Sequence, residues 1–218
     1  MTLSTKANAA TGAGGRPLSR RGRKRKAEIL DAVLTIVGRD GMAGLSMRAL
    51  AAEADIPLGA TTYYFTTKSE LVGEAFRLHA ARETERVLDV VVNLPSEPTA
   101  LQLADQLASF LIEGLSQRRL QLIAEYELLV EATRDEELAT LSRSWLNIMQ
   151  DELKIVMTRL GSPSPEVDVD VLLGLLAGLE VDHLSAEPTA VDSVRIQMVV
   201  RRAVMALFPT AGKPGPKQ

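Results

Sequence analysis

Apolar residues recur at helical spacing along most of the chain. Over residues 24–39 the pattern places Ile29, Val33, Ile36 and Val37 on one helix face, and a glycine follows as a stop signal. No convincing alternation of apolar and polar residues predicts strands. The sequence therefore predicts an all-α protein with about nine helices in total. Beyond residue 68, helices are expected at about 69–92, 100–117, 119–133, 135–160, 166–184 and 189–208.

Residues 46–68 predict two short helices joined by a tight turn. Ser46 is a good N-cap, because its hydroxyl can accept a hydrogen bond from the first helical turn. Ala51 is small enough to let two helices cross closely. Asp55 and Pro57 then break the first helix, and the proline is well placed to begin the second. This is the layout of a helix-turn-helix, whose second helix enters the major groove of DNA.

The exposed face of the second helix is small, hydroxylated and aromatic. Threonine hydroxyls and methyls suit base edges in the major groove. The side chains of Tyr63, Tyr64, Thr67 and Lys68 can donate to phosphates, which fixes the register of the protein without reading sequence. The alternative interpretation of the same spacing is a surface helical hairpin that only packs.

Charge is divided unevenly along the 218 residues. The formal net charge is −3, yet residues 1–68 hold 11 Lys and Arg against 5 Asp and Glu, which leaves 14 against 23 for the rest. Seven of the eleven residues at 16–26 are basic. Such a basic arm raises affinity for DNA through counterion release and can reach an adjacent minor groove. For residues 1–18 a solvated, disordered tail is the preferred interpretation.

The segment from about Arg23 to Leu71 resembles the DNA-binding domain of the tetracycline-repressor (TetR) family of bacterial transcriptional regulators. It shares, in order, a first helix ending near a Gly, a Leu-Ser helix start, an Ala-rich second helix, and Tyr-Tyr-Phe followed by Lys and an acidic residue. Two positions depart from the pattern: Asp55 replaces a turn Gly and Pro57 a capping Ser. The resemblance implies that DNA is contacted by Arg23, Lys24, Ser46, Arg48, Leu58, Gly59, Ala60, Thr61, Thr62, Tyr63, Tyr64 and Lys68.

The resemblance also implies a division of the chain. A helix-turn-helix domain with its basic arm is expected at 19–68, and a helical effector-binding and dimerisation domain at 69–208. The last segment, 209–218, is expected to be a disordered tail.

Dimerisation is favoured by apolar repeats in the last two long helices. These faces are intramolecular core by default, but the resemblance implies a two-fold dimer built as a four-helix bundle. Two recognition helices about 34 Å apart could then read a palindromic operator. The expected interface residues are Leu172, Gly174, Leu175, Gly178, Leu179, Ile196, Val199, Val200, Ala203 and Val204.

A small-molecule effector pocket is a further implication of the resemblance. The residues expected to line this pocket could instead be ordinary hydrophobic core. Glu125, Glu127 and Glu131 are expected on a solvated face rather than against a cationic effector. The predicted function is a repressor that an effector releases from its operator. The alternative is a DNA-binding regulator with no small-molecule effector. The expected lining is Phe76, His79, Phe110, Tyr126, Trp145 and Met149.

Composition argues against other classes of function. The chain has no Cys and two His, which supplies a metal site poorly. It lacks a nucleophile elbow, a paired-His metal motif, a phosphate loop and a dinucleotide fingerprint, so no enzyme, cofactor or metal is expected. The longest apolar run, 171–181, is too short to span a bilayer, and the N-terminus does not resemble a signal peptide. A cytoplasmic protein, on the nucleoid when bound to DNA, is expected.

Overall fold

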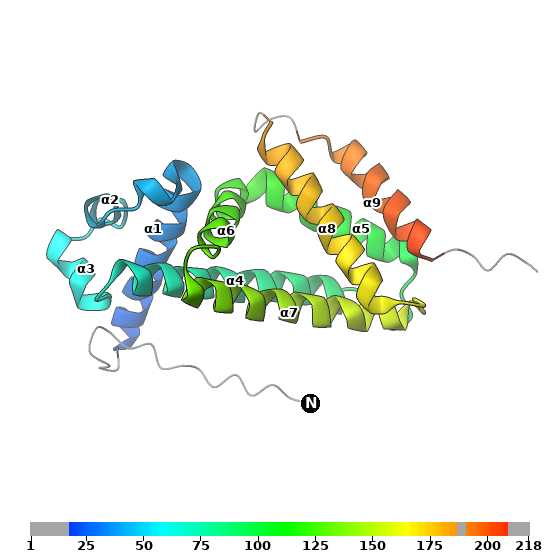
Figure 1. Ribbon diagram of the computed structural model, residues 1–218, viewed down its shortest axis with the longest axis horizontal. Helices are drawn as coiled ribbons and strands as arrows, with labels where there is room; N and C mark the ends of the chain where they lie inside the picture. Colours follow the sequence, from blue (N-terminus) through cyan, green and yellow to red (C-terminus); the bar gives the residue numbers. More distant parts are fainter. Residues whose placement is uncertain (1–17, 187–190, 209–218) are drawn as a thin grey trace, which may run out of the picture. The chain divides into compact units, whose positions relative to one another are not determined.

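The computed structural model describes residues 18–186 and 191–208, and these residues form nine α-helices without a strand (Figure 1). The prediction of an all-α chain is confirmed. Residues 1–17 of the tail expected at 1–18, the tail expected at 209–218 and the predicted helix start at Thr189 lie outside the described residues. Leu18 is described and is 7% exposed, so the expectation of a solvated tail is wrong for this residue. The helices are α1 (Arg20–Gly44), α2 (Met47–Glu53), α3 (Leu58–Tyr64), α4 (Lys68–Val92), α5 (Ala100–Gln117), α6 (Arg119–Glu131), α7 (Glu136–Arg159), α8 (Pro165–Leu184) and α9 (Ser193–Leu207).

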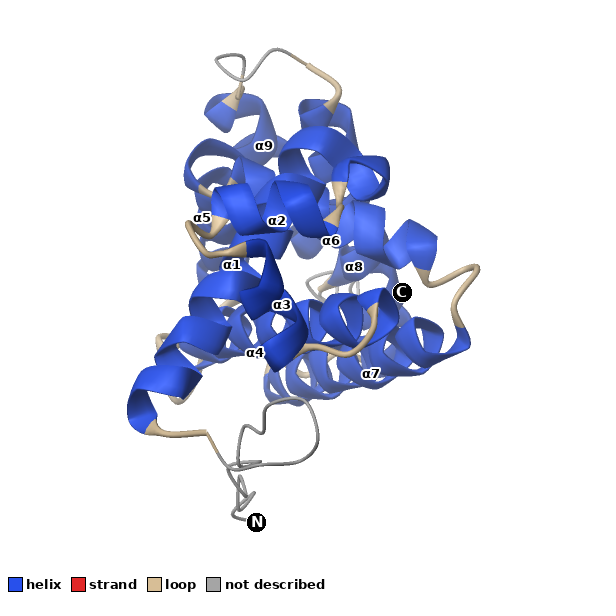
Figure 2. Cartoon of the chain, turned by 90° about the vertical axis from the view of Figure 1, so that its left-hand side faces the viewer, coloured by secondary structure: helices blue, strands red, loops and turns tan. Residues whose placement is uncertain are grey.

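The chain divides into two compact units. The first contains the described residues up to Ala80 together with Ile123–Ser142, and the second contains Ala81–Leu122 together with the described residues from Arg143 onward. Short loops join α1, α2 and α3 within the first unit (Figure 2). The first unit thus extends past residue 68, where the sequence predicts a functional domain boundary.

Helix α1 begins at Arg20, four residues earlier than expected. The Ser19 hydroxyl caps it by accepting a hydrogen bond from the backbone N–H of Gly22 at 3.2 Å. Arg and Lys are good helix formers, so the capped basic run continues the helix. The expected helix start at Lys24 is therefore wrong, because residues 20–23 of the basic arm are also helical. Gly41 interrupts the helix as predicted, with φ 70° and ψ 177°.

The turn between α2 and α3 has the predicted chemistry. Ser46 caps α2, since its hydroxyl accepts from the backbone N–H of Ala49 at 3.1 Å. Asp55 has φ 49°, a left-handed conformation that Asp tolerates better than most residues. Helix α3 follows Pro57 directly and has no side-chain cap. Leu50 and Ala51 are buried where the two helices pack.

The segment Ile123–Ser142 is bound to the rest of the first unit by polar contacts. The Glu127 carboxylate accepts from the backbone N–H of Met42 at 3.4 Å, and Arg77 donates to Glu137 at 2.8 Å. The hydroxyl of Ser69 lies 3.4 Å from the carboxylate of Asp135. The C-terminal part of α6 and the first turns of α7 therefore belong to the same packed body as the helix-turn-helix.

Helices α5, α8 and α9 form the core of the second unit and pack against one another (Figure 1). Leu103 and Leu111 of α5, Leu172 of α8, and Ile196 and Val204 of α9 are almost fully buried. Thr99 begins α5 with a reciprocal capping box to Gln102, which satisfies two backbone donors at once.

Candidate DNA interface

Helix α3 presents its predicted face to solvent. Leu58 is 56% exposed and Tyr63 is 61% exposed, and Gly59 and Thr62 are also exposed. Exposed apolar and aromatic side chains on a seven-residue helix gain nothing from the fold itself, so this face is suited to an external partner.

Thr61 was expected to contact DNA, but it is buried. Its side chain is 1% exposed, and its hydroxyl donates to the backbone carbonyl of Leu58 at 2.8 Å. The residue lies on the inner face of α3, three positions from Leu58 and four from Phe65, and it helps to pack the helix. Thr61 is therefore not available to contact DNA. Ala60 is half-buried.

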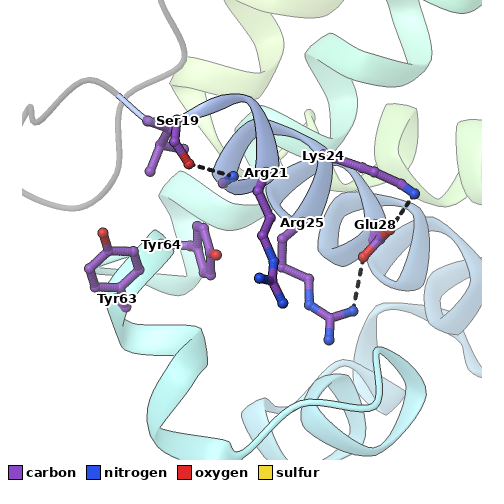
Figure 3. Close-up of a pocket in the computed structure, with 9 residues that line it drawn as sticks. Ser19, Arg21, Lys24, Arg25, Glu28, Tyr63 and Tyr64 are labelled. Atoms are coloured by element: carbon purple, nitrogen blue, oxygen red, sulfur yellow. Dashed lines mark hydrogen bonds and ion pairs between the residues drawn. The ribbon is translucent and has the colours of Figure 1, made fainter.

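A cationic cleft lies beside α3, between its last residues and the start of α1 (Figure 3). Its volume is about 830 Å³. The rings of Tyr63 and Tyr64 meet edge to face with centroids 5.0 Å apart. The lining residues are Leu18, Ser19, Arg21, Gly22, Lys24, Arg25, Glu28, Tyr63 and Tyr64.

The basic residues of α1 have distinct surroundings. Lys24 extends into solvent, with 81% of its side chain exposed and its Nζ 3.9 Å from Glu28. Arg23, also expected at the interface, donates to the backbone carbonyl of Leu18 at 2.8 Å and does not line the cleft. Arg21 and Arg25 do line it, although neither was among the predicted contacts. Helical periodicity carried through residue 20 would have placed them on the face of Lys24.

The turn from α3 to α4 is fixed by hydrogen bonds that join Glu70 to Thr66 and Thr67. The backbone N–H and the hydroxyl of Thr66 donate to Glu70 at 2.7 and 2.6 Å, and the Glu70 N–H donates to the hydroxyl of Thr67 at 3.0 Å. The bonds from Thr66 hold the pKa of Glu70 below its usual range, because they favour the charged form.

The remaining expected contacts surround this turn. Lys68 opens α4 from an exposed position, with Nζ 3.5 Å from the backbone carbonyl of Met42. Ser46 and Arg48 at the start of α2 are exposed as well.

The expected effector residues divide between the two units. Phe76, His79 and Tyr126 belong to the first unit, and Phe110, Trp145 and Met149 to the second. All but Phe110 and Tyr126 are buried, and Phe110 stacks under the guanidinium of Arg86 at 4.2 Å.

A buried polar pair lies among these residues in the first unit. The Nε2 of His79 is 2.7 Å from a carboxylate oxygen of Glu125, with 2% and 13% of the two side chains exposed. The expectation of a solvated face is therefore wrong for Glu125. The apolar repeat of its neighbours does not reveal this, because the pairing depends on a histidine 46 residues away.

The expected dimer residues also divide. Leu172, Ile196, Val200 and Val204 are buried inside the second unit, so they form its core and are not free for a partner chain. Their regular spacing marks the faces on which α5, α8 and α9 pack against one another, and it does not identify the outer faces of α8 and α9. Gly174 and Gly178 are exposed, and Leu175, Leu179, Val199 and Ala203 are half-buried.

The outer faces of α8 and α9 carry different apolar residues, which the sequence pattern missed. Their exposed fractions run from 47% to 67%. On α8 they share one side with the two exposed glycines, at spacings of three and four. They are Val167, Val171 and Val181 on α8, and Val194, Met198 and Met205 on α9.

Comparisons with known protein families match an N-terminal and a C-terminal segment of the chain. A family described as bacterial regulatory proteins, tetR family, matches residues 29–75, and one described as tetracyclin repressor-like, C-terminal domain, matches residues 98–210. The chain belongs to the TetR family. The first match covers α2, α3 and the cleft-forming tyrosines, and the second covers α5 to α9.

Named relatives of this TetR-family chain are transcriptional regulators, not enzymes. It is 38% identical over 76 residues to the regulator PksA of Bacillus subtilis (strain 168), covering 34% of this chain and 37% of PksA. It is 26% identical over 129 residues to the nicotine-responsive repressor HdnoR of Paenarthrobacter nicotinovorans, covering 59% and 65%. The matches thus span less than two thirds of either relative.

Solved structures align over more of the chain. The multidrug binding protein EbrR, complexed with ethidium, is 31% identical over 82% of this chain and 98% of its own, with a TM-score of 0.60. A TetR-family member from Streptomyces coelicolor A3, SCO1917, is 30% identical over 83% and 98%, with a TM-score of 0.63.

The part of the chain that the structure describes has neither a cluster of metal ligands nor a membrane-spanning helix. It contains no group of three or more His, Cys, Asp or Glu side chains that could hold a metal ion. It also contains no helix with the length and apolar character needed to cross a membrane.

Proposed function

We propose that this TetR-family chain is a sequence-specific DNA-binding repressor that binds a palindromic operator as a dimer and is released by a small-molecule effector. The observation that carries the proposal is the exposed face of α3 beside a cleft lined by Arg21, Lys24 and Arg25.

Base reading is assigned to the outward side of α3. Thr62 offers a methyl and a hydroxyl, although that hydroxyl donates to the carbonyl of Gly59 at 2.9 Å and so meets DNA as an acceptor. Leu58 and the methyl of Thr62 suit the thymine methyl in the major groove. Gly59 leaves the helix backbone bare, which lets it approach base edges closely.

Phosphate binding is assigned to the cleft and to Lys68. The cleft combines cationic side chains of α1 with Tyr63 and Tyr64, which can donate to phosphate oxygens. The salt slope is the decrease in the logarithm of the binding constant per unit of the logarithm of salt concentration, and each phosphate neutralised by Lys or Arg contributes about 0.9 to it. The basic start of α1 therefore supplies affinity, whereas α3 supplies selectivity.

Dimerisation is assigned to the exposed faces of α8 and α9. Val171 and Val181 on α8 and Met198 on α9 leave apolar surface in water that a second copy would cover. The exposed faces also differ in charge. Asp170 and Asp182 lie on α8, whereas Arg195 lies on α9, so contact between α8 and the partner's α9 would bring opposite charges together.

Release by an effector is supported by the relatives' names and by the buried pair of His79 and Glu125. HdnoR is nicotine-responsive, and EbrR has been solved with ethidium, malachite green and proflavin. We propose an organic cation as effector, because a carboxylate that is 13% exposed could serve as its counter-ion. Regulation without an effector is the competing function.

A competition titration tests the proposal. The purified chain is titrated with DNA from upstream of its own gene, and unrelated DNA of equal length competes at several salt concentrations. A specific regulator that controls its own gene should prefer its own DNA about a thousandfold or more. If neither this DNA nor any duplex selected from a random library is preferred, sequence-specific binding is refuted.

The effector is tested on the same complex. Ethidium, nicotine and proflavin are added in turn, with uncharged aromatic molecules as controls, and release of DNA is followed together with the melting temperature. A ligand of the folded protein must raise the melting temperature. DNA binding that no compound in a broad panel alters would favour the regulator without an effector.

A further inference from the structure

Lys26 differs from the other described basic residues at the start of α1. It is 5% exposed, while Lys24 two positions earlier extends into solvent. Its Nζ lies 3.5 Å from a carboxylate oxygen of Glu74 on α4 and 5.3 Å from the centroid of the Phe65 ring. One ammonium group thus contacts α4 and the residue that ends α3.

A buried ammonium needs compensation. Removing such a charge from water costs several kcal/mol even after relaxation of the surroundings. The carboxylate of Glu74 and the face of the Phe65 ring offset that cost in this site. An apolar residue could fill the space without that cost, so packing alone does not require the charge.

Phe65 connects this charge to the recognition helix. Its ring is 2% exposed, and its backbone N–H donates to the carbonyl of Thr61 at 3.1 Å, which closes the last turn of α3. Since Thr61 is itself buried, a displacement of Phe65 would carry α3 with it.

We propose that Lys26 is a positioning residue that sets the orientation of α3 on α1 and α4 without touching DNA. The inference rests on the proposed function and deepens it, because it separates two roles within one basic run. Lys24 serves DNA affinity, and Lys26 serves the alignment of the helix that reads bases.

The test compares Lys26→Met with Lys24→Met on two DNA duplexes. One duplex is selected by the wild-type chain from a random-sequence library, and the other is unrelated and of equal length. Affinity for each is measured over a series of salt concentrations. The ratio of the two affinities does not depend on the fraction of folded protein, so partial unfolding alone cannot move it.

The expected results differ in kind. Lys26→Met should reduce the ratio by about tenfold or more, since misaligned base contacts weaken selected DNA alone, and should leave the salt slope unchanged. Lys24→Met should reduce the slope by about 0.9 and keep the ratio. Lys26→Arg should restore the ratio, because Arg retains the charge and stacks on aromatic rings.

Two outcomes overturn the inference while leaving the proposed function in place. They are an unchanged ratio in Lys26→Met, and a salt slope that falls as it does in Lys24→Met. If Lys26→Met does not fold, Glu74→Gln decides by the same ratio, since it removes the counter-charge from a position that is 35% exposed. A wild-type chain that selects no duplex refutes the proposed function itself.

Discussion

Gly59 lies on the exposed face of α3, and nothing in the described part of the chain requires a glycine there. Among the described glycines, positive φ is found at Gly41 and Gly161 but not at Gly59. A Cβ placed on Gly59 would meet no atom within 4 Å. The fold alone would accept alanine at this position, which is the better helix former.

The substitution Gly59→Ala should therefore have opposite effects on stability and on binding. Replacing Gly by Ala at a compatible site stabilises by about 0.4–1 kcal/mol, which raises the melting temperature of a chain of this size by about 1–4 °C. If the backbone of α3 approaches the bases closely, the added methyl group overpacks that interface at a cost of about 1–3 kcal/mol. Affinity for selected DNA would then fall by roughly 5- to 150-fold.

Thermal unfolding and DNA titration of one preparation check both halves. Gly114→Ala is the matched control, because a Cβ on this α5 glycine also meets no atom within 4 Å and lies in the second unit. It should raise stability and leave DNA binding unchanged. A Gly59→Ala protein that melts higher and binds DNA as well as the wild type would refute close approach of the α3 backbone.

Three further predictions concern other parts of the chain. Lys68→Ala should weaken binding to all DNA and reduce the salt slope by about 0.9; an unchanged slope would contradict the phosphate contact. Val171→Asp should convert the dimer to monomers in analytical ultracentrifugation. Ile148→Asp is the control, because Ile148 is an exposed apolar residue on α7, and it should leave the dimer intact. Equal effects of the two substitutions would exclude α8 from the interface. Glu70→Gln should lower the free energy of unfolding in urea most at neutral pH. The pKa of Glu70 is lower in the folded protein than the unfolded value of about 4.3, so its charged form stabilises the fold above that value. This stabilisation is lost as the pH falls through the folded pKa. A difference that does not vary with pH would refute the role of the Thr66 bonds.

Local signals were enough to predict most of the helices. Ser46, Asp55 and Gly41 act through their own backbone and its nearest neighbours, so their roles as cap, left-handed turn and stop were readable from the sequence. Helix α5 has the bounds that were predicted, because Thr99 and Gln102 form a cap that depends on three consecutive peptide groups.

Contacts between distant segments were not readable in the same way. The repeat that includes Leu172 was assigned to a dimer, yet the structure buries this residue against other helices of the same unit. Glu125 was assigned to solvent, yet His79 pairs with it. In both cases the sequence pattern could not say which partner covers the residue, because the partner lies on a distant segment.

The helix-turn-helix formed by α2 and α3 depends on tertiary packing more than on helix propensity. Helices α2 and α3 have seven residues each, and helices this short are marginal in water without partners. The structure supplies those partners through the buried Thr61 and Phe65 and through the bonds of Glu70 to Thr66. Reshaping α3 would break all of these contacts at once. We therefore expect an effector to move α1–α3 together with the start of α4 as one body, so that effector-bound protein should lose selected DNA while hydrogen exchange in α3 stays slow.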